Sequence, residues 1–401
     1  MNKIKFNGKK IAATAIMLVI YVAVLIYCNN IYKTELIATG GQTYEKATVT
    51  EITHDNLQED GNRYGNQEVM LKIKSGELKG QEVEAISPNG NLFGANCTVG
   101  MHVIAMVSIS GDTEVVTVYS QDRTAAIYGF AFFFIACVCL IGGWKGFKSI
   151  LSLAFTGITI FFILFPLIYK GLSPILTSVI ICAIATVFSM SMIGGLSTKT
   201  VSATIGTIFG VIASAVAALV FGHFAGITGY NVSDIETLNF LAQSTPIRIG
   251  ELLFSGIIIS ALGAVTDVGV SVASAIQEIH DTNPKIRKRQ LFVSGIHVGR
   301  DMMGTMVDTL ILAYVGTALS TLVTNYAYDF SYNYLINSNN IGIEIMQSLA
   351  GSLGIVLAVP ITAFVAVELI YRKPKEEKAV AEQMSDGDNE NMPEGISVSE
   401  N

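Results

Sequence analysis

Two apolar stretches of this 401-residue chain carry acidic and hydroxyl side chains at helical spacing. The first stretch holds Ser260, Asp267, Ser271, Ser274 and Glu278. The second holds His297, Asp301, Thr305 and Asp308. At about 3.6 residues per turn, each set falls on one face of a helix. Ionisable groups are costly in lipid and usually mark a substrate or ion pathway, so both faces are candidates for such a path.

The depth of Asp308 strengthens this interpretation. If Arg300 marks the membrane boundary, a rise of about 1.5 Å per residue carries Asp308 about 12 Å into the apolar core. A carboxylate at that depth must be paired, hydrated or protonated. We therefore expect a path lined by Asp267, Asp308, Ser271, Ser274 and Thr305. At its cytoplasmic mouth we expect a gate or ion pairs built from Arg300, Asp301, Glu278 and His297.

A purely structural role is the alternative for these charges. Asp308, Asp267 and Arg300 could form buried pairs that lock two helices together without any transport. For Arg300 and Asp301, which lie close to the membrane boundary, the two readings are equally balanced. For Asp308 and Asp267 the depth and the shared face favour a path.

Enzyme chemistry finds no support in the sequence. There is no HExxH, GxSxG or paired CxxC pattern, and five scattered cysteines offer neither a disulfide framework nor a metal site. The segment 194–200 lacks the glycine that precedes the lysine of a P-loop. We expect no enzyme, no cofactor, no metal and, without a basic surface, no nucleic-acid partner. Transport energy would come from an ion gradient or from a separate partner.

Long apolar runs must position these side chains. The chain is 51% hydrophobic and only 14% charged, whereas about a quarter of residues are charged in soluble proteins. Eight runs are long enough to cross a bilayer, which takes about 20 helical residues. They are 11–27, 126–143, 150–169, 173–194, 201–225, 250–270, 303–323 and 341–371. We expect an all-α polytopic membrane protein with eight transmembrane helices, its seven-helix membrane domain spanning 126–372.

Charge placement predicts the orientation. Lysines precede the first run and bulky residues follow it where a cleavage site would need small ones, so 1–28 is expected to be a retained signal anchor. Short loops on the cytoplasmic side carry the basic residues. Alternate loops here hold Lys145, Lys148, Lys199, Lys285, Arg287, Lys288, Arg289 and Arg372. Both termini are therefore expected in the cytoplasm. The lipid partner is expected to be the bacterial cytoplasmic membrane, which the chain crosses several times.

Residues 29–125 are expected to form a small extracytoplasmic all-β domain. Apolar and polar residues alternate in 47–52, 69–73, 83–86, 103–109 and 115–119, which indicates five short antiparallel strands. Five such strands suit an OB-like or SH3-like barrel that acts as a lid, an assembly element or a partner contact. The acidic segment 373–401 has little to bury and is expected to be a disordered cytoplasmic tail.

Two local features concern the candidate path. A helix over 250–278 is longer than a bilayer is thick, so it either projects into the cytoplasm or breaks, with Gly263 and Gly269 as candidate break points. After it, Asn283 and Pro284 predict the start of a short basic helix. That helix would bind anionic headgroups or a cytoplasmic partner.

The same stretches resemble the signature blocks of the YibE/F family of bacterial multipass membrane proteins. The matching blocks are 263–268, 279–284, 299–306 and 308–314, which begin Gly-Ala-Val-Thr-Asp, Ile-His-Asp-Thr-Asn-Pro, Gly-Arg-Asp-Met-Met-Gly and Asp-Thr-Leu-Ile. The resemblance covers roughly 128 to 371, and the anchor and β domain resemble the longer, YibE-type members. It implies an assembly with a shorter YibE/F-like membrane partner, and it assigns no chemistry. A homo-oligomer is the alternative to that assembly.

The expected function is therefore a transporter or permease component for a small solute or ion. The rival expectation is a non-transporting assembly or signalling scaffold. A scaffold would tolerate neutral substitutions along both faces but would fail without its β domain. A third possible function is a permease driven by an ATPase partner. In that case the basic segment 285–289 would contact a nucleotide-binding subunit.

Overall fold

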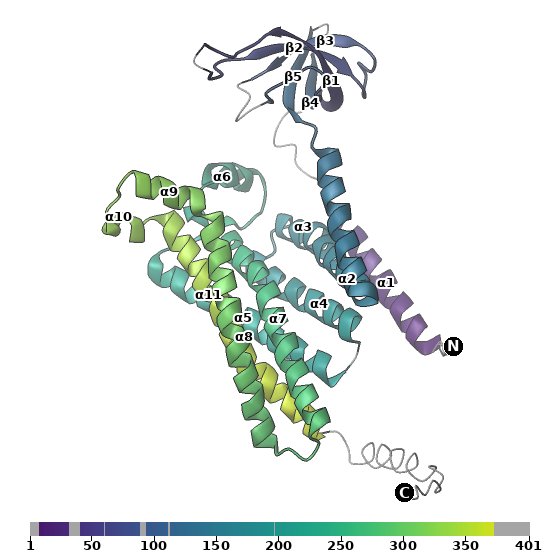
Figure 1. Cartoon of the computed structure of the whole chain (residues 1–401), viewed down its shortest axis with the longest axis vertical. Helices are drawn as coiled ribbons and strands as arrows, with labels where there is room; N and C mark the ends of the chain where they lie inside the picture. Colours follow the sequence, from purple (N-terminus) through teal and green to yellow (C-terminus); the bar gives the residue numbers. More distant parts are fainter. Residues whose placement is uncertain are drawn as a thin grey trace, which may run out of the picture. The chain divides into compact units, whose positions relative to one another are not determined.

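The computed structural model describes residues 8–31, 41–59, 61–88, 94–110, 113–195 and 197–372. The expected tail at 373–401 and the first seven residues of the anchor lie outside these ranges. The chain forms two compact units, Glu35–Gly146 and the combination of Met1–Thr34 with Phe147–Asn401 (Figure 1). The first unit contains the β-strands, and the second contains most of the helices.

The strands of the first unit close into a barrel. They are β1 (Gln42–His54), β2 (Gln67–Ile73), β3 (Glu82–Ser87), β4 (His102–Ser110) and β5 (Thr113–Gln121). All five predicted strands are confirmed, and each is somewhat longer than predicted at one or both ends. Their order is β1-β2-β3-β5-β4, and β4 pairs back with β1. Of the two barrels considered, this five-stranded Greek-key closure is the OB type.

One pairing differs from the expected antiparallel arrangement. β3 and β5 run parallel, with Ile86 opposite Thr117, whereas the other pairs are antiparallel. The cause is the return of β4 to β1, which leaves β5 to close against β3 in the same direction. The apolar residues of the predicted alternation fill the interior of the barrel. Examples that are at most 1% exposed are Val49, Val69, Leu71, Val103 and Val118.

Two polar side chains, and not strand pairing, fix the position of the connection between β3 and β4. The amide of Gln67 donates to the Cys97 carbonyl at 3.1 Å and accepts from the Cys97 N–H at 2.9 Å. The Ser87 hydroxyl donates to the Ala95 carbonyl at 2.6 Å and accepts from its N–H at 3.0 Å. Gln67 also donates to Asp55, whose pKa the hydrogen-bonded guanidinium of Arg63 holds below its usual value.

Replacing Gln67 by leucine is expected to destabilise the barrel by about 2 to 5 kcal/mol, because it leaves the buried N–H and carbonyl of Cys97 without partners. Urea unfolding of the segment 41–123, followed by circular dichroism, measures the change. Gln81→Leu is the matched control, since Gln81 is exposed and surface substitutions change stability by about 0.5 kcal/mol or less. Equal midpoints for Gln67→Leu and the parent would contradict the role of Gln67.

The helices run along most of the remaining chain. They are α1 (Gly8–Asn29), α2 (Thr124–Thr159), α3 (Phe165–Tyr169), α4 (Pro174–Gly194), α5 (Thr198–Ala225), α6 (Ile235–Ser244), α7 (Leu252–Thr282), α8 (Lys288–Thr317), α9 (Leu319–Ala327), α10 (Tyr332–Ile336) and α11 (Asn339–Arg372). A π-helical turn at Ile160–Leu164 joins α2 to α3. Within the described ranges, five helices are long and apolar enough to cross a membrane, or six if the pair α8 and α9, bent by 62°, counts as one. These helices indicate a membrane protein.

A break at Gly143 divides α2 into two segments. Gly143 has φ 52° and ψ −134°, a conformation outside the helical region that glycine adopts without steric cost. A Cβ on Gly146 would collide with the carbonyl oxygen of Val138. Residues eight apart in a straight helix are separated by about 12 Å, so the chain turns back on itself here. The sequence likewise placed two separate apolar runs on either side of this point.

α7 is one continuous helix of 31 residues, about 46 Å long at the usual rise. Of the two predicted alternatives, the break at Gly263 or Gly269 is therefore wrong. The other alternative is that α7 extends beyond a bilayer core, which is about 30 Å thick. Gly269 instead allows α5 to come close, since a Cβ there would lie 2.9 Å from the Thr207 hydroxyl and 3.2 Å from the Ala203 carbonyl.

The short basic helix predicted after α7 is also absent from this part of the described chain. The N–H of Asn283 still bonds to the Ile279 carbonyl at 3.0 Å, so Asn283 ends α7 instead of starting a helix. Pro284 lies in the following turn, and α8 begins only at Lys288. The basic residues thus occupy the α7–α8 connection and the first turn of α8.

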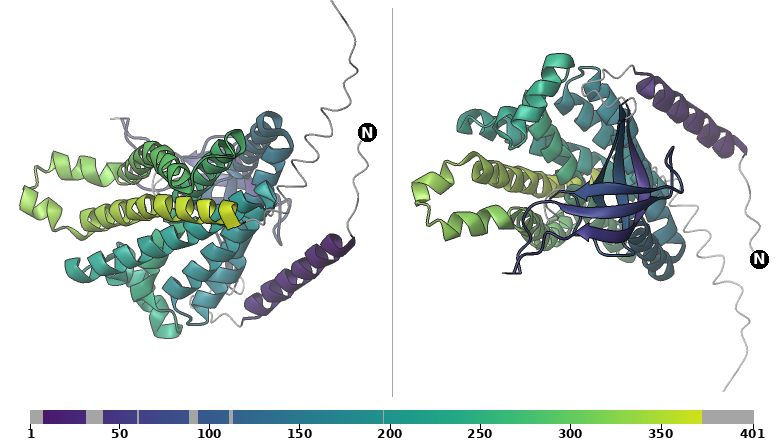
Figure 2. Two further views of the ribbon diagram at one scale, coloured as in Figure 1. Left: turned by 90° about the horizontal axis from the view of Figure 1, so that it is seen from below. Right: turned by 90° about the horizontal axis from the view of Figure 1, so that it is seen from above.

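α11 lies in the middle of the helical bundle. It packs against α5, α7 and α8, and Figure 2 shows it in yellow with other helices on both sides. The core between them contains Val265, Val272, Ile355, Ala358 and Val359, each at most 3% exposed. Gly210 of α5 and Gly354 of α11 meet backbone to backbone, so these two helices cross very closely.

Candidate functional site

The polar side chains of α7 share one face, as predicted, and that face points away from the bundle core. Val265, Val268, Val272 and Ile276 are buried on the opposite side. Asp267 and Glu278 are exposed, and Ser271 and Ser274 are half-buried. Ser274 donates to the Val270 carbonyl at 2.5 Å, the common local bond of a helical serine.

The candidate residues of α8 lie on its outer side as well. Leu291, Gly295 and Gly299 are the residues that α8 buries, and they face α7 and α11. Those on the exposed side are His297, Arg300, Asp301, Thr305 and Asp308. Thr305 makes a long 3.5 Å bond to the Asp301 carbonyl. We call these five, with Gly304 of α8 and Ser260, Gly263, Asp267, Ser271, Ser274 and Glu278 of α7, the polar face.

The charges of the polar face have no partners among the described residues. The side chains of Asp267, Asp301, Asp308 and Arg300 form no ion pair and no hydrogen bond there. The part of the chain that the structure describes therefore contains no pair that locks α7 to α8 through these groups. One copy of the chain leaves them uncovered, although lipid is a poor solvent for charge.

The packing of α7 on α8 brings the two sets of acids to similar depths. Val272 contacts Gly299, and the Ser260 hydroxyl bonds to the Tyr314 hydroxyl at 2.5 Å. Between these contacts, Asp267 is about level with Gly304 and Asp308 about level with Gly263. A Cβ on either of these glycines would meet nothing within 4 Å, so both acids lie beside open space.

The structure adds a residue that sequence reasoning missed. Glu344 of α11 has one carboxyl oxygen that is buried without a hydrogen-bond partner among the described residues. The carboxylate lies near Tyr314, whose hydroxyl bonds to that of Ser260. The available signal was an acid inside the last apolar run with Ser348 one turn later. That run appeared to be apolar scaffold because its two acids, Glu344 and Glu368, are 24 residues apart and form no repeat at helical spacing.

The other end of the polar face is tied to the end of α11. Lys288 pairs with Glu368, which Arg372 also contacts at 3.2 Å. The Tyr371 hydroxyl donates to the Ile286 carbonyl in the α7–α8 connection. These contacts anchor the mouth of the polar face near Glu278 and His297 to the central helix of the bundle.

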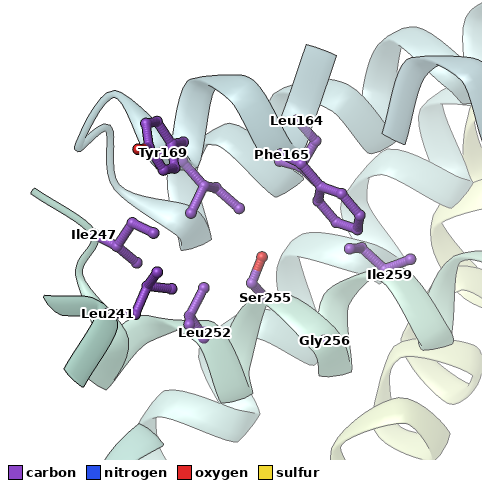
Figure 3. Close-up of a pocket in the computed structure, with 10 residues that line it drawn as sticks. Leu164, Phe165, Tyr169, Leu241, Ile247, Leu252, Ser255, Gly256 and Ile259 are labelled. Atoms are coloured by element: carbon purple, nitrogen blue, oxygen red, sulfur yellow. The ribbon is translucent and has the colours of Figure 1, made fainter. Parts of the chain in front are cut away.

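A separate apolar pocket of about 360 Å³ lies between the α3 region and the start of α7. Figure 3 shows Leu164 and Phe165 facing Leu252 and Ile259 across it, with the Ser255 hydroxyl directed inward. That hydroxyl already bonds to Ser178 and to the Pro174 carbonyl. None of the predicted site residues lines this pocket, so it is distinct from the polar face.

The family model for YibE/F-like proteins matches residues 130–372. The chain belongs to the YibE/F family. The predicted resemblance is thus confirmed, and the matched region contains α7, α8 and α11 and with them the whole polar face of this YibE/F protein. The barrel lies outside the match. No curated protein and no solved structure matches the chain.

Proposed function

We propose that this YibE/F protein is a permease component that moves a small cation along its polar face. The observation that carries the proposal is that Asp267 and Asp308 are exposed on two adjacent apolar helices, about one helical turn apart in height. Neither side chain has an ion-pair or hydrogen-bond partner among the described residues. Lipid does not solvate such groups, so water or another subunit must cover them. Acid-lined pathways favour cations.

The proposed topology has eight spans with both termini in the cytoplasm and the barrel outside the cytoplasmic membrane. The turn at Gly143 supports counting the apolar runs on either side of it as two spans. The basic connection between α7 and α8 supports a cytoplasmic position for that end. Residues 126–372 then form the membrane domain, and α7 projects beyond the bilayer on the cytoplasmic side.

The proposed path has three levels. Glu344, Tyr314 and Ser260 lie at its outer end, where three helices bring polar groups together. Asp267 and Asp308 form the middle level, with Thr305 and Ser271 beside them. Arg300, Asp301, His297, Ser274 and Glu278 line the cytoplasmic mouth, where the arginine can gate or brace it.

Cysteine accessibility tests whether the polar face is wet. In a chain whose five native cysteines are replaced, Thr305→Cys is expected to react with a charged, membrane-impermeant thiosulfonate. Val216→Cys is the matched control, because Val216 is 53% exposed on the apolar outer side of α5 and would face lipid. Mass spectrometry of the intact protein measures both reactions. A Thr305→Cys protein that reacts no faster than the control would exclude a water-filled path.

An assembly or signalling scaffold is the second candidate. Its supporting observation is the barrel, which has a hydrophobic core of its own and lies outside the family match. A scaffold would keep its polar face dry in the assembled state and tolerate neutral residues there. It would lose its function when the barrel is deleted, whereas the proposed path would still conduct.

A further inference from the structure

We infer that the polar face is completed by the polar face of a second copy of this chain, so that the path runs between two copies. The inference rests on the proposed function in placing this face at membrane depth. It adds the identity of the covering partner and a specific pair of charges at the contact.

α8 is the edge helix of the bundle, as its burial shows. Among its 30 residues, three are buried, compared with twelve of the 31 residues of α7. α11 and α7 cover one side of α8, and nothing in the described chain covers the other. A helix at membrane depth that exposes charges on its free side needs a protein neighbour, because water reaches that depth only in a cavity that protein encloses.

The charges identify that neighbour as a copy of the same surface. Arg300 is adjacent to Asp301 on the exposed side of α8, and neither has a partner among the described residues. A two-fold axis along the membrane normal keeps every residue at the same depth in both copies. Arg300 of one copy then lies level with Asp301 of the other, and the reverse pair forms by symmetry. The surface is therefore complementary to itself.

Small residues allow the two copies to approach closely. Gly304, one turn from Arg300, has open space where a Cβ would be, and glycines of this kind permit close helix contact in membranes. Asp267 and Asp308 of each copy then flank the axis, which doubles the number of acids along the path. One copy alone supplies only half of this lining.

Disulfide cross-linking of the full-length chain tests the contact. In the cysteine-replaced background and in membranes, Thr305→Cys is expected to give a covalent dimer on mild oxidation with copper phenanthroline. Val216→Cys, on the far side of the bundle core, is expected to give none. Absence of the Thr305→Cys dimer, or an equal amount of dimer from Val216→Cys, would overturn the inference.

Exchanging the charges of Arg300 and Asp301 tests the proposed pairing of these residues between the two copies. The test then does not depend on Thr305→Cys alone. Adding Arg300→Asp or Asp301→Arg to Thr305→Cys is expected to reduce the dimer yield at least fivefold, since like charges then meet across the axis. The double exchange is expected to restore the yield to within twofold. Single exchanges that leave the yield unchanged would show that Arg300 and Asp301 do not meet.

The two proposals fail in different ways. A Thr305 thiol that reacts with the thiosulfonate but never cross-links indicates a wet path with another partner, such as a different protein chain, and overturns only the second-copy inference. A thiol that cross-links but does not react with the thiosulfonate indicates a dry dimer. That result supports the second copy and overturns the path.

Discussion

Gly210→Val is expected to prevent the membrane domain from folding. A Cβ at this position of α5 would lie 2.8 Å from the Gly354 carbonyl and 2.5 Å from a methyl group of Val265. The reciprocal Cβ on Gly354 would lie 2.7 Å from the Gly210 carbonyl, so backbone meets backbone at this crossing. Overpacking a core costs about 1 to 3 kcal/mol, and rigid carbonyl groups yield less than side chains do.

Size-exclusion chromatography and thermal unfolding in detergent measure this effect. The expected result is aggregated protein or a strongly lowered melting temperature. Gly157→Val is the matched control, because Gly157 is also helical and its Cβ would meet nothing within 4 Å. A Gly210→Val protein that elutes and melts like the parent would show that α5 and α11 do not cross as described.

Asp308→Asn is expected to reduce cation flux at least tenfold while the protein stays folded. Asparagine has nearly the same shape as aspartate but no charge, so a cation passing this level loses its counter-charge. A tenfold effect needs only about 1.4 kcal/mol of lost stabilisation. The fold should tolerate the change, since the Asp308 side chain contributes no hydrogen bond or ion pair to the described structure.

Flux of protons and alkali cations into proteoliposomes, followed with ion-sensitive dyes, measures the loss. Asp329→Asn serves as the matched control. Asp329 is exposed in the turn after α9 with φ 51°, a backbone conformation that asparagine accepts. A folded and fully active Asp308→Asn protein would remove Asp308 from the mechanism, and an unfolded one would give it a structural role.

Residue periodicity was sufficient to predict the local structure. The five strands follow from apolar alternation in segments such as 69–73, because half-buried strands repeat every two residues. The shared face of Asp267 and Ser271 on α7, and of Asp301 and Asp308 on α8, follows from the helical repeat. Each pattern predicts which residues of a single helix or strand share a side, and both predictions are confirmed.

Long-range contacts determined the rest. The usual placement of acids in membrane helices predicts that the faces of α7 and α8 point into the bundle. They point outward instead, because periodicity does not specify which neighbour a face meets. The close crossing of Gly210 and Gly354 draws α5 and α11 together, and α7 and α8 bury their apolar sides against them. Asp267 and Asp308 consequently lie on the outer surface of the bundle. Glu344 of α11 lies near Tyr314, at the end of the polar face that contains Ser260. These contacts join residues far apart in the chain, so no local pattern contains them.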